Sequence, residues 1–98
     1  MKTPLHGPDL HPHAEPHGAP NLYKPELRDG DGATVWGPGT PCTQNEALAL
    51  AWQELRGRQV GAVGDAWRRG EIDEIEGRRL IEAIKADVGA IIEGLVGR

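Results

Sequence analysis

The residues best suited to chemistry are four histidines, and all of them lie near the N-terminus, in the stretch LHGPDLHPHAEPHGAP at residues 5–20. They are His6, His11, His13 and His17. Asp9 and Glu15 lie among them, and imidazole and carboxylate groups are ligands that zinc and nickel accept. A proline at every fourth position, however, stiffens the chain against wrapping around an ion, and His-rich tracts bind metals weakly. We therefore expect no resident metal and no cofactor, and a His-rich metal-binding protein is only the third hypothesis for function.

Two further motifs offer chemistry, and both have simpler interpretations. Cys42 is the only cysteine, and it directly precedes a predicted helix start, whose positive end would lower a thiol pKa. No histidine lies near it in the sequence to act as a base. Asp29-Gly30-Asp31-Gly32 is similar to the opening of a calcium loop, but Thr40 stands where that loop needs its final glutamate. This motif predicts a turn, and we expect that the chain is not an enzyme.

Composition limits the partners. The chain has 98 residues and a net charge of −4, which allows one small domain. Residues 1–43 carry 3 basic and 5 acidic groups, and residues 44–98 carry 8 and 10, so neither part is a basic surface for nucleic acid. No apolar run approaches the roughly 20 residues of a membrane span, and the N-terminus lacks the apolar core of a signal peptide. We expect no direct nucleic-acid partner, no membrane partner, and a location in a virion or the bacterial cytoplasm.

The N-terminal part, residues 1–43, holds all 8 prolines and few large apolar side chains. Each proline fixes φ and moves the preceding residue out of the α region. The prolines near the N-terminus recur every four residues, whereas a polyproline II helix repeats every three, so they mark no single face of such a helix. One short strand or extended anchor is suggested at Ala33–Trp36, without a visible partner strand. We predict an extended arm with little regular structure.

The C-terminal part, residues 44–98, predicts two helices joined by a tight turn. Thr43 and Glu46 have the spacing of a capping box, and apolar residues then recur at steps of three and four. The helices span about 44–69 and 74–96, and the short connection makes them an antiparallel hairpin.

Three glycines complicate the first helix, because Gly57, Gly61 and Gly64 each cost about 1 kcal/mol of helix propensity relative to alanine. In one interpretation the helix is continuous through Gly57–Gly64, and its small face lets another backbone approach closely. In the other, the helix breaks near Gly61–Gly64 and a short third helix follows. The predicted fold class is mainly α: a long extended Pro/Gly/His-rich arm followed by an antiparallel helical hairpin, with that third helix as the alternative.

An extended arm followed by a compact hairpin is how small accessory proteins fasten onto large assemblies. A hairpin of this size exposes apolar positions that association covers. We predict a non-enzymatic structural or interaction protein that straps onto other protein subunits and self-associates, most specifically a small bacteriophage virion component of a capsid or tail. The alternative is a small acidic inhibitor or regulator of another protein. The residues expected to contact the partner are large apolar side chains: Tyr23, Val35, Trp36, Leu50, Trp67 and Ile92.

Overall fold

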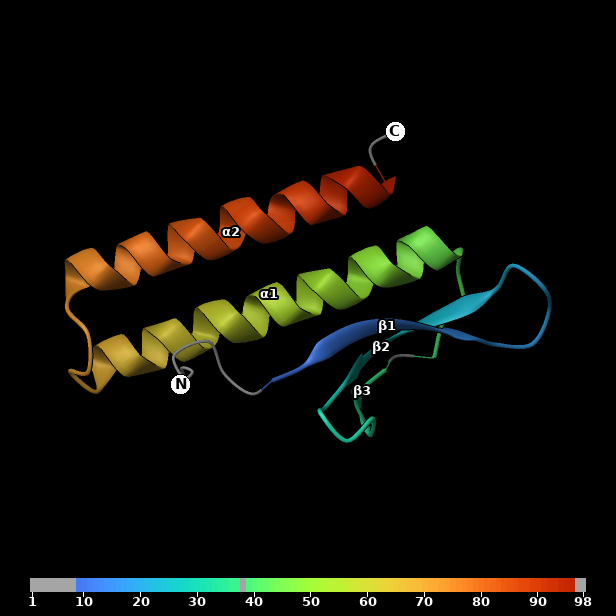
Figure 1. Ribbon diagram of the computed structural model, residues 1–98, viewed down its shortest axis with the longest axis horizontal. Coiled ribbons are helices and arrows are strands. Elements are labelled where there is room, and N and C mark those ends of the chain that lie inside the picture. The colour runs from blue at the N-terminus through green and yellow to red at the C-terminus, as the bar shows by residue number, and fades with distance from the viewer. Residues whose placement is uncertain (1–8, 38, 97–98) are drawn as a thin grey trace.

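The computed structural model describes residues 9–37 and 39–96. Three β-strands come first along the chain and two long α-helices follow, in the order β1 (His11–Pro16), β2 (Tyr23–Arg28), β3 (Thr34–Trp36), α1 (Gln44–Arg68) and α2 (Glu74–Val96). Figure 1 shows α1 in the middle of the molecule, with the sheet on one side and the antiparallel α2 on the other. Within the described residues the sheet and α2 both contact α1 and do not contact each other. The fold is therefore assembled around α1.

The sheet corrects the predicted fold class, which placed an extended arm at residues 1–43 and no sheet. The three strands are antiparallel, in the order β1-β2-β3. Residues 11–16 read HPHAEP and residues 23–28 read YKPELR, so polar and apolar side chains alternate in both, as in a strand with one buried face. The prediction was wrong because it compared the spacing of the prolines with a polyproline helix, and not with the two-residue period of a strand.

Prolines are compatible with this sheet because their backbone nitrogens point away from the interface between β1 and β2. Tyr23 exchanges two backbone hydrogen bonds with Cys42, both 2.8 Å long, on the edge of β2 that faces away from β1. Backbone groups alternate between the two edges of a strand, so Pro25 turns its nitrogen to that same edge. By the same alternation, Pro12 and Pro16 turn theirs away from β2, to the free edge of the sheet. Proline nitrogens carry no hydrogen to donate. Because the backbone direction alternates every residue, prolines four residues apart all turn these nitrogens to the same edge of the strand.

Turn residues close both β-hairpins. Gly18 and Asn21, between β1 and β2, adopt the left-handed conformation with φ of 78° and 69°, which these residue types tolerate best. Between β2 and β3, a carboxylate oxygen of Asp29 accepts hydrogen bonds from the backbone amides of Asp31 and Ala33, at 2.9 and 3.0 Å. The Asp-Gly repeat is therefore a turn that places β3 beside β2.

Both helices begin at side-chain caps. The Thr43 hydroxyl accepts a hydrogen bond from the Glu46 amide at 3.2 Å, and the Glu46 carboxylate accepts one from the Thr43 amide at 3.3 Å, which confirms the capping box. The helix then runs unbroken over Gln44–Arg68, so the alternative with a third short helix is wrong. At the start of α2, a carboxylate oxygen of Asp73 accepts a hydrogen bond from the Glu76 amide at 2.8 Å. Over the described residues, neither helix combines the length and the hydrophobicity needed to cross a membrane.

The core consists of two apolar clusters on opposite sides of α1. The cluster on the sheet side contains Leu10, Leu27, Ala51 and Leu55. The cluster on the α2 side contains Val63, Ile84 and Val88. The half-buried ring of Trp52 packs against both clusters and joins them. The segment expected to be an extended arm thus contributes buried side chains to the same core as the helices.

Glycines in the two helices have different surroundings. A Cβ atom added at Gly57 or Gly61 of α1 would meet no atom within 4 Å, so no backbone among the described residues approaches this face closely. A Cβ added at the buried Gly77 of α2 would lie 2.9 Å from Cε3 of Trp67, closer than real Cβ atoms approach. Gly77 is therefore needed where the end of α1 packs on the start of α2.

We expect Gly57→Ala to raise the free energy of unfolding by about 1 kcal/mol, because it adds helix propensity in open space. Gly77→Ala should lower the same quantity by about 1 kcal/mol, since overpacking against the rigid indole outweighs the gain in propensity. Urea denaturation of both variants beside the wild type measures the two effects. Equal stabilisation by both alanines would contradict the close packing of Gly77 on Trp67.

Candidate functional site

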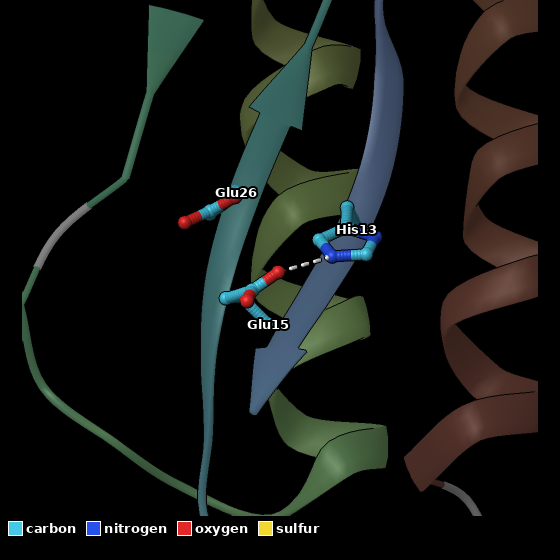
Figure 2. Close-up of side chains that lie close together, drawn as sticks. All are labelled: His13, Glu15 and Glu26. Atoms are coloured by element: carbon cyan, nitrogen blue, oxygen red, sulfur yellow. Dashed lines mark hydrogen bonds and ion pairs between the residues drawn. The ribbon is translucent and has the colours of Figure 1, made fainter. Parts of the chain in front are cut away.

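The outer face of the sheet carries a cluster of polar side chains. Leu27 of β2 points into the core against α1, so its neighbours Glu26 and Arg28 point to the opposite face. The register of β1 and β2 places His13 opposite Glu26 on that face. Figure 2 shows His13, Glu15 and Glu26 close together in front of the strands, with α1 behind them. We call this group the sheet cluster; its members are His13, Glu15, Glu26, Arg28 and Thr34.

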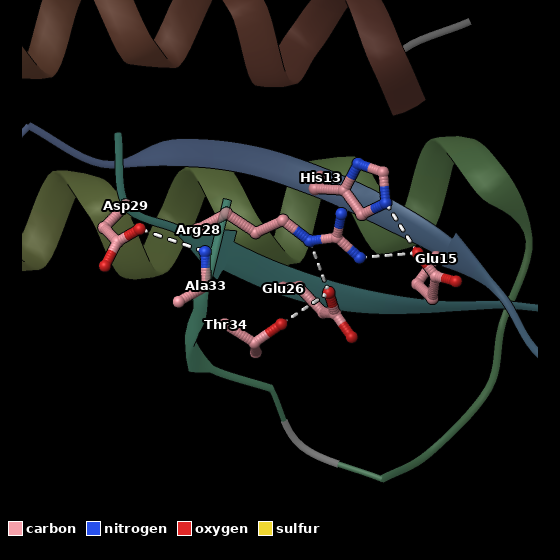
Figure 3. Close-up of polar contacts among 7 residues, drawn as sticks. All are labelled: His13, Glu15, Glu26, Arg28, Asp29, Ala33 and Thr34. Atoms are coloured by element: carbon pink, nitrogen blue, oxygen red, sulfur yellow. Dashed lines mark hydrogen bonds and ion pairs between the residues drawn. The ribbon is translucent and has the colours of Figure 1, made fainter. Parts of the chain in front are cut away.

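Arg28 is the centre of the sheet cluster (Figure 3). Its Nη2 donates to Oε1 of Glu15 at 2.6 Å, and its Nε donates to Oε1 of Glu26 at 3.0 Å. Oε1 of Glu15 also lies 2.8 Å from Nε2 of His13, and Oε1 of Glu26 accepts from the Thr34 hydroxyl at 3.2 Å. Only 11% of the Glu26 side chain is exposed, so its carboxylate depends on these donors. One guanidinium thus balances two carboxylates, and the contacts join all three strands.

These contacts shift the pKa values of Glu15 and Arg28. The hydrogen bond to His13, with the charge of Arg28, holds the pKa of the Glu15 carboxyl below its usual range, although partial desolvation opposes the shift. The hydrogen bond to Glu26, helped by the negative charges of Glu26 and Glu15, raises the pKa of Arg28. Both groups are therefore charged at neutral pH.

The lowered pKa of Glu15 predicts a loss of stability in acid. Its contribution to the free energy of unfolding is complete above the pKa of an unfolded glutamate, and it is lost as the pH falls through the lower, folded pKa. Urea unfolding at stepped acidic pH should therefore show a steeper decline for the wild type than for Glu15→Gln. Glu82→Gln, at an exposed position of α2, is the control and should decline as the wild type does. Equal slopes for all three proteins would contradict the role of Glu15.

The sheet cluster has the residue types of a metal site, but its cation is an arginine. One ligand atom each from His13, Glu15 and Glu26 lies within 4.8 Å of the other two. Arg28 already hydrogen-bonds both carboxylates, and its fixed positive charge would repel a divalent ion at that place. We therefore interpret the cluster as a network that joins the strands.

Removing Arg28 should reveal the metal-binding capacity of the cluster. We expect Arg28→Met to raise the affinity for zinc by about tenfold or more, because two carboxylates are freed and a repelling charge is lost. Titration calorimetry with zinc measures this. Arg58→Met is the matched control, because it removes an arginine from the single carboxylate of Glu54, with a nitrogen–oxygen distance of 2.9 Å. Zinc binding that is equally weak in both variants would contradict this interpretation of Arg28.

The histidines of the N-terminal stretch do not gather at one place. His13 belongs to the sheet cluster, whereas Nε2 of His11 lies 3.6 Å from a carboxylate oxygen of Asp9. His17 is exposed just after β1, and His6 lies outside the described residues. The described histidines therefore do not converge as a set of metal ligands.

Cys42 does not have the surroundings of a reactive cysteine. Burial and the nearby carboxylate of Glu46 raise the pKa of its thiol, which is the opposite of the effect expected from the helix end alone. A thiol that keeps its proton is a weak nucleophile. The residue instead forms a β-bridge with Tyr23 and so fastens the start of α1 to the sheet.

A second candidate site lies where α1 begins and α2 ends. Three adjoining hollows of about 260, 400 and 450 Å³ open there, and Gln53 lines all of them. Leu50 and Val96 each line two of the three, and these residues are 43% and 55% exposed. We call this region the Leu50 surface; its central residues are Trp36, Leu50, Gln53, Arg56, Ile92 and Val96.

Three of the residues expected to contact a partner, Trp36, Leu50 and Ile92, line the Leu50 surface. Trp36 is half buried against the sheet-side cluster, and Ile92 packs against the α2-side cluster, so Leu50 is the most exposed of the three. Gln53 and Val96 were not expected there. Their place follows from the antiparallel pairing of α1 and α2, which brings the end of one helix beside the start of the other.

The other three expected contact residues lie elsewhere. Trp67 lines a separate hollow of about 690 Å³ at the far end of α1. Tyr23 is half buried on β2, and Val35 is 45% exposed on β3. The sequence-based list also omitted Glu26 and Arg28, although the alternation of polar residues in 23–28 would have placed both on one face of a strand.

The sheet cluster and the Leu50 surface differ in whether their side chains already have partners within the chain. The carboxylates of the sheet cluster and Arg28 satisfy one another, whereas the Leu50 surface exposes apolar side chains to solvent. No protein-family model, curated protein or solved structure matches this chain. Of the two surfaces, the Leu50 surface has more to gain from binding a partner, because apolar area remains to be covered there.

Proposed function

We propose that this chain is a non-enzymatic interaction protein that joins a larger protein assembly through the Leu50 surface. The observation that carries the proposal is the exposure of Leu50 itself, a leucine between two hollows on the first turns of α1. Burying apolar area is favourable by roughly 25 cal/mol per Å², so covering Leu50 and Val96 with a partner would contribute to binding. Apolar patches with polar surroundings are typical of interaction sites.

The chemistry of the described side chains supports the non-enzymatic part of this proposal. The carboxylates of the sheet cluster are held by Arg28, and the thiol of Cys42 has a raised pKa. The four hollows with described linings contain no histidine, and none includes a member of the sheet cluster. A general acid or base at a concave site is therefore not supported by these residues.

The identity of the assembly is a separate question. The hypothesis of a bacteriophage virion component relied on a free strap, and residues 11–36 instead form a sheet packed on α1. The extended arm of residues 1–43 is therefore not part of the proposal. The hypothesis of a virion component stays a prediction. The alternative of a small acidic inhibitor or regulator differs from it in stoichiometry, because a virion component occurs in many symmetric copies and an inhibitor occurs once per target.

Native mass spectrometry of the complex isolated from the source cells tests the proposal. The wild type should be recovered in a complex of defined stoichiometry, and Leu50→Asp should be released from it. Leu22→Asp is the matched control, because Leu22 is 38% exposed at the β1–β2 turn and lines none of the three hollows. A wild type recovered only as a free monomer, or a complex that Leu50→Asp leaves intact, would overturn the proposal.

A further inference from the structure

We propose that the Leu50 surface binds a second copy of this chain, with the two copies antiparallel and related by two-fold symmetry. This inference rests on the proposed function, because it names the partner of the same surface. Its basis is the distribution of charge along the Leu50 surface, which is opposite at the two ends.

Apart from Glu54, the acidic and basic residues that line the Leu50 surface are separated along the helix axes. Glu46 and Arg56 are ten residues apart on α1, about 15 Å at the rise of an α-helix. Glu93 and Lys85 are eight residues apart on α2, about 12 Å. Because α2 runs antiparallel to α1, the two acidic residues lie at the end where α1 begins, and the two basic residues lie nearer the middle of the hairpin (Figure 1).

Most of these charges have no partner of their own. Within residues 9–37 and 39–96, the side chains of Arg56, Lys85 and Glu93 take part in no ion pair. The other acidic residue beside them, Glu54, is paired with Arg58 at 2.9 Å. The Leu50 surface therefore presents a negative end and a positive end, both open to a partner.

A surface with this pattern is complementary to itself after a half-turn. Rotation about an axis through the region of Gln53, which lines all three hollows, places the negative end of one copy on the positive end of the other. Such an axis reverses the helix direction and lays α1 on α1 and α2 on α2, so Glu93 of each copy faces Lys85 of the other, and Glu46 faces Arg56. A partner that is uniformly acidic or basic would meet like charge at one of the two ends, which favours a second copy over such a partner.

The middle of the surface permits the close approach that such a pairing needs. The side of α2 that lines it there consists of the small residues Ala86, Gly89 and Ala90, and a Cβ added at Gly89 would meet no atom within 4 Å. Leu50 and Val96 of each copy would lose their exposure in the same contact. The two hairpins would together form a four-helix arrangement with the sheets on its outside.

Complementary charge reversal tests this pairing with the full chain. Glu93→Arg alone and Lys85→Glu alone should each raise the dissociation constant of the dimer by about tenfold or more, since each places like charges opposite each other twice. An equimolar mixture of the two variants should recover the wild-type dissociation constant, because both reciprocal pairs are then attractive again. Sedimentation equilibrium across the micromolar range measures all four cases.

Glu82→Arg, at an exposed position of α2 outside the hollows, is the control and should dimerise as the wild type does. Recovery by the mixture also shows that both variants are folded. A wild type that stays monomeric, a dimer that either single reversal leaves unchanged, or a mixture that stays monomeric would overturn the inference. A complex that holds one copy of this chain with a different protein at the Leu50 surface would also overturn it, while the proposed function would stand.

Discussion

Leu27→Ala should lower the free energy of unfolding of the whole chain by about 3 kcal/mol, in the usual range for truncating a buried leucine. Leu27 lies on the central strand, is fully buried, and packs in one cluster with Ala51 and Leu55 of α1. The helices should therefore unfold at lower urea concentration although the substitution is in the sheet. Far-UV circular dichroism, which reports mainly the helices, measures the shift of the transition.

The matched control for this prediction is Val35→Ala on β3, where the side chain is 45% exposed. It should change the free energy of unfolding by less than about 0.5 kcal/mol, as is usual for exposed positions. If Leu27→Ala left the helical transition unchanged, residues 9–37 would not fold as one unit with α1.

Trp52→Ala should have the largest effect of any single substitution considered for this chain, about 4 kcal/mol, within the range for truncating a core tryptophan. Trp52 packs against both apolar clusters, so its loss leaves a cavity on the sheet side and on the α2 side of α1. A small domain has about 5–15 kcal/mol of stability in total, and the variant should accordingly be close to its unfolding threshold at room temperature.

Trp52→Phe supplies the control, because a smaller aromatic ring keeps much of the contact with both clusters; it should cost less than about half as much as Trp52→Ala. Urea denaturation followed by circular dichroism compares the two without relying on tryptophan fluorescence. A Trp52→Ala variant no less stable than Trp52→Phe would show that the two clusters do not depend on this ring.

The helical part of the fold could be predicted because its signals are local. The capping box joins Thr43 to a residue three positions later, and the apolar residues that pack α1 on α2 recur at helical spacing. The glycines of α1 lower its propensity, yet the helix is continuous because Val63 and its neighbours pack against α2 along that segment. Tertiary packing outweighs the cost of about 1 kcal/mol per glycine.

The sheet could be predicted only in part. The alternation in residues 11–16 and 23–28 is visible in the sequence, but an isolated short strand has no stability until a neighbour and an apolar surface are present. The surface is supplied by α1, through Ala51 and Leu55, which are separated from Leu27 by more than twenty residues of chain. In the register that the structure adopts, Pro12 and Pro16 leave no gap in the hydrogen bonds between β1 and β2.

Both candidate sites were decided by tertiary structure. The contact between Arg28 and Glu15 joins residues 13 positions apart, and it exists because the β1–β2 turn sets the register of the strands. Leu50 was among the residues expected to contact a partner, and it is exposed because neither the sheet nor α2 covers that side of α1. Interactions between near neighbours in the sequence are enough to specify which segments form helices and which residues cap them. Which apolar side chains remain exposed depends on how the sheet, α1 and α2 pack, because burial is a property of the assembled elements and not of any one segment.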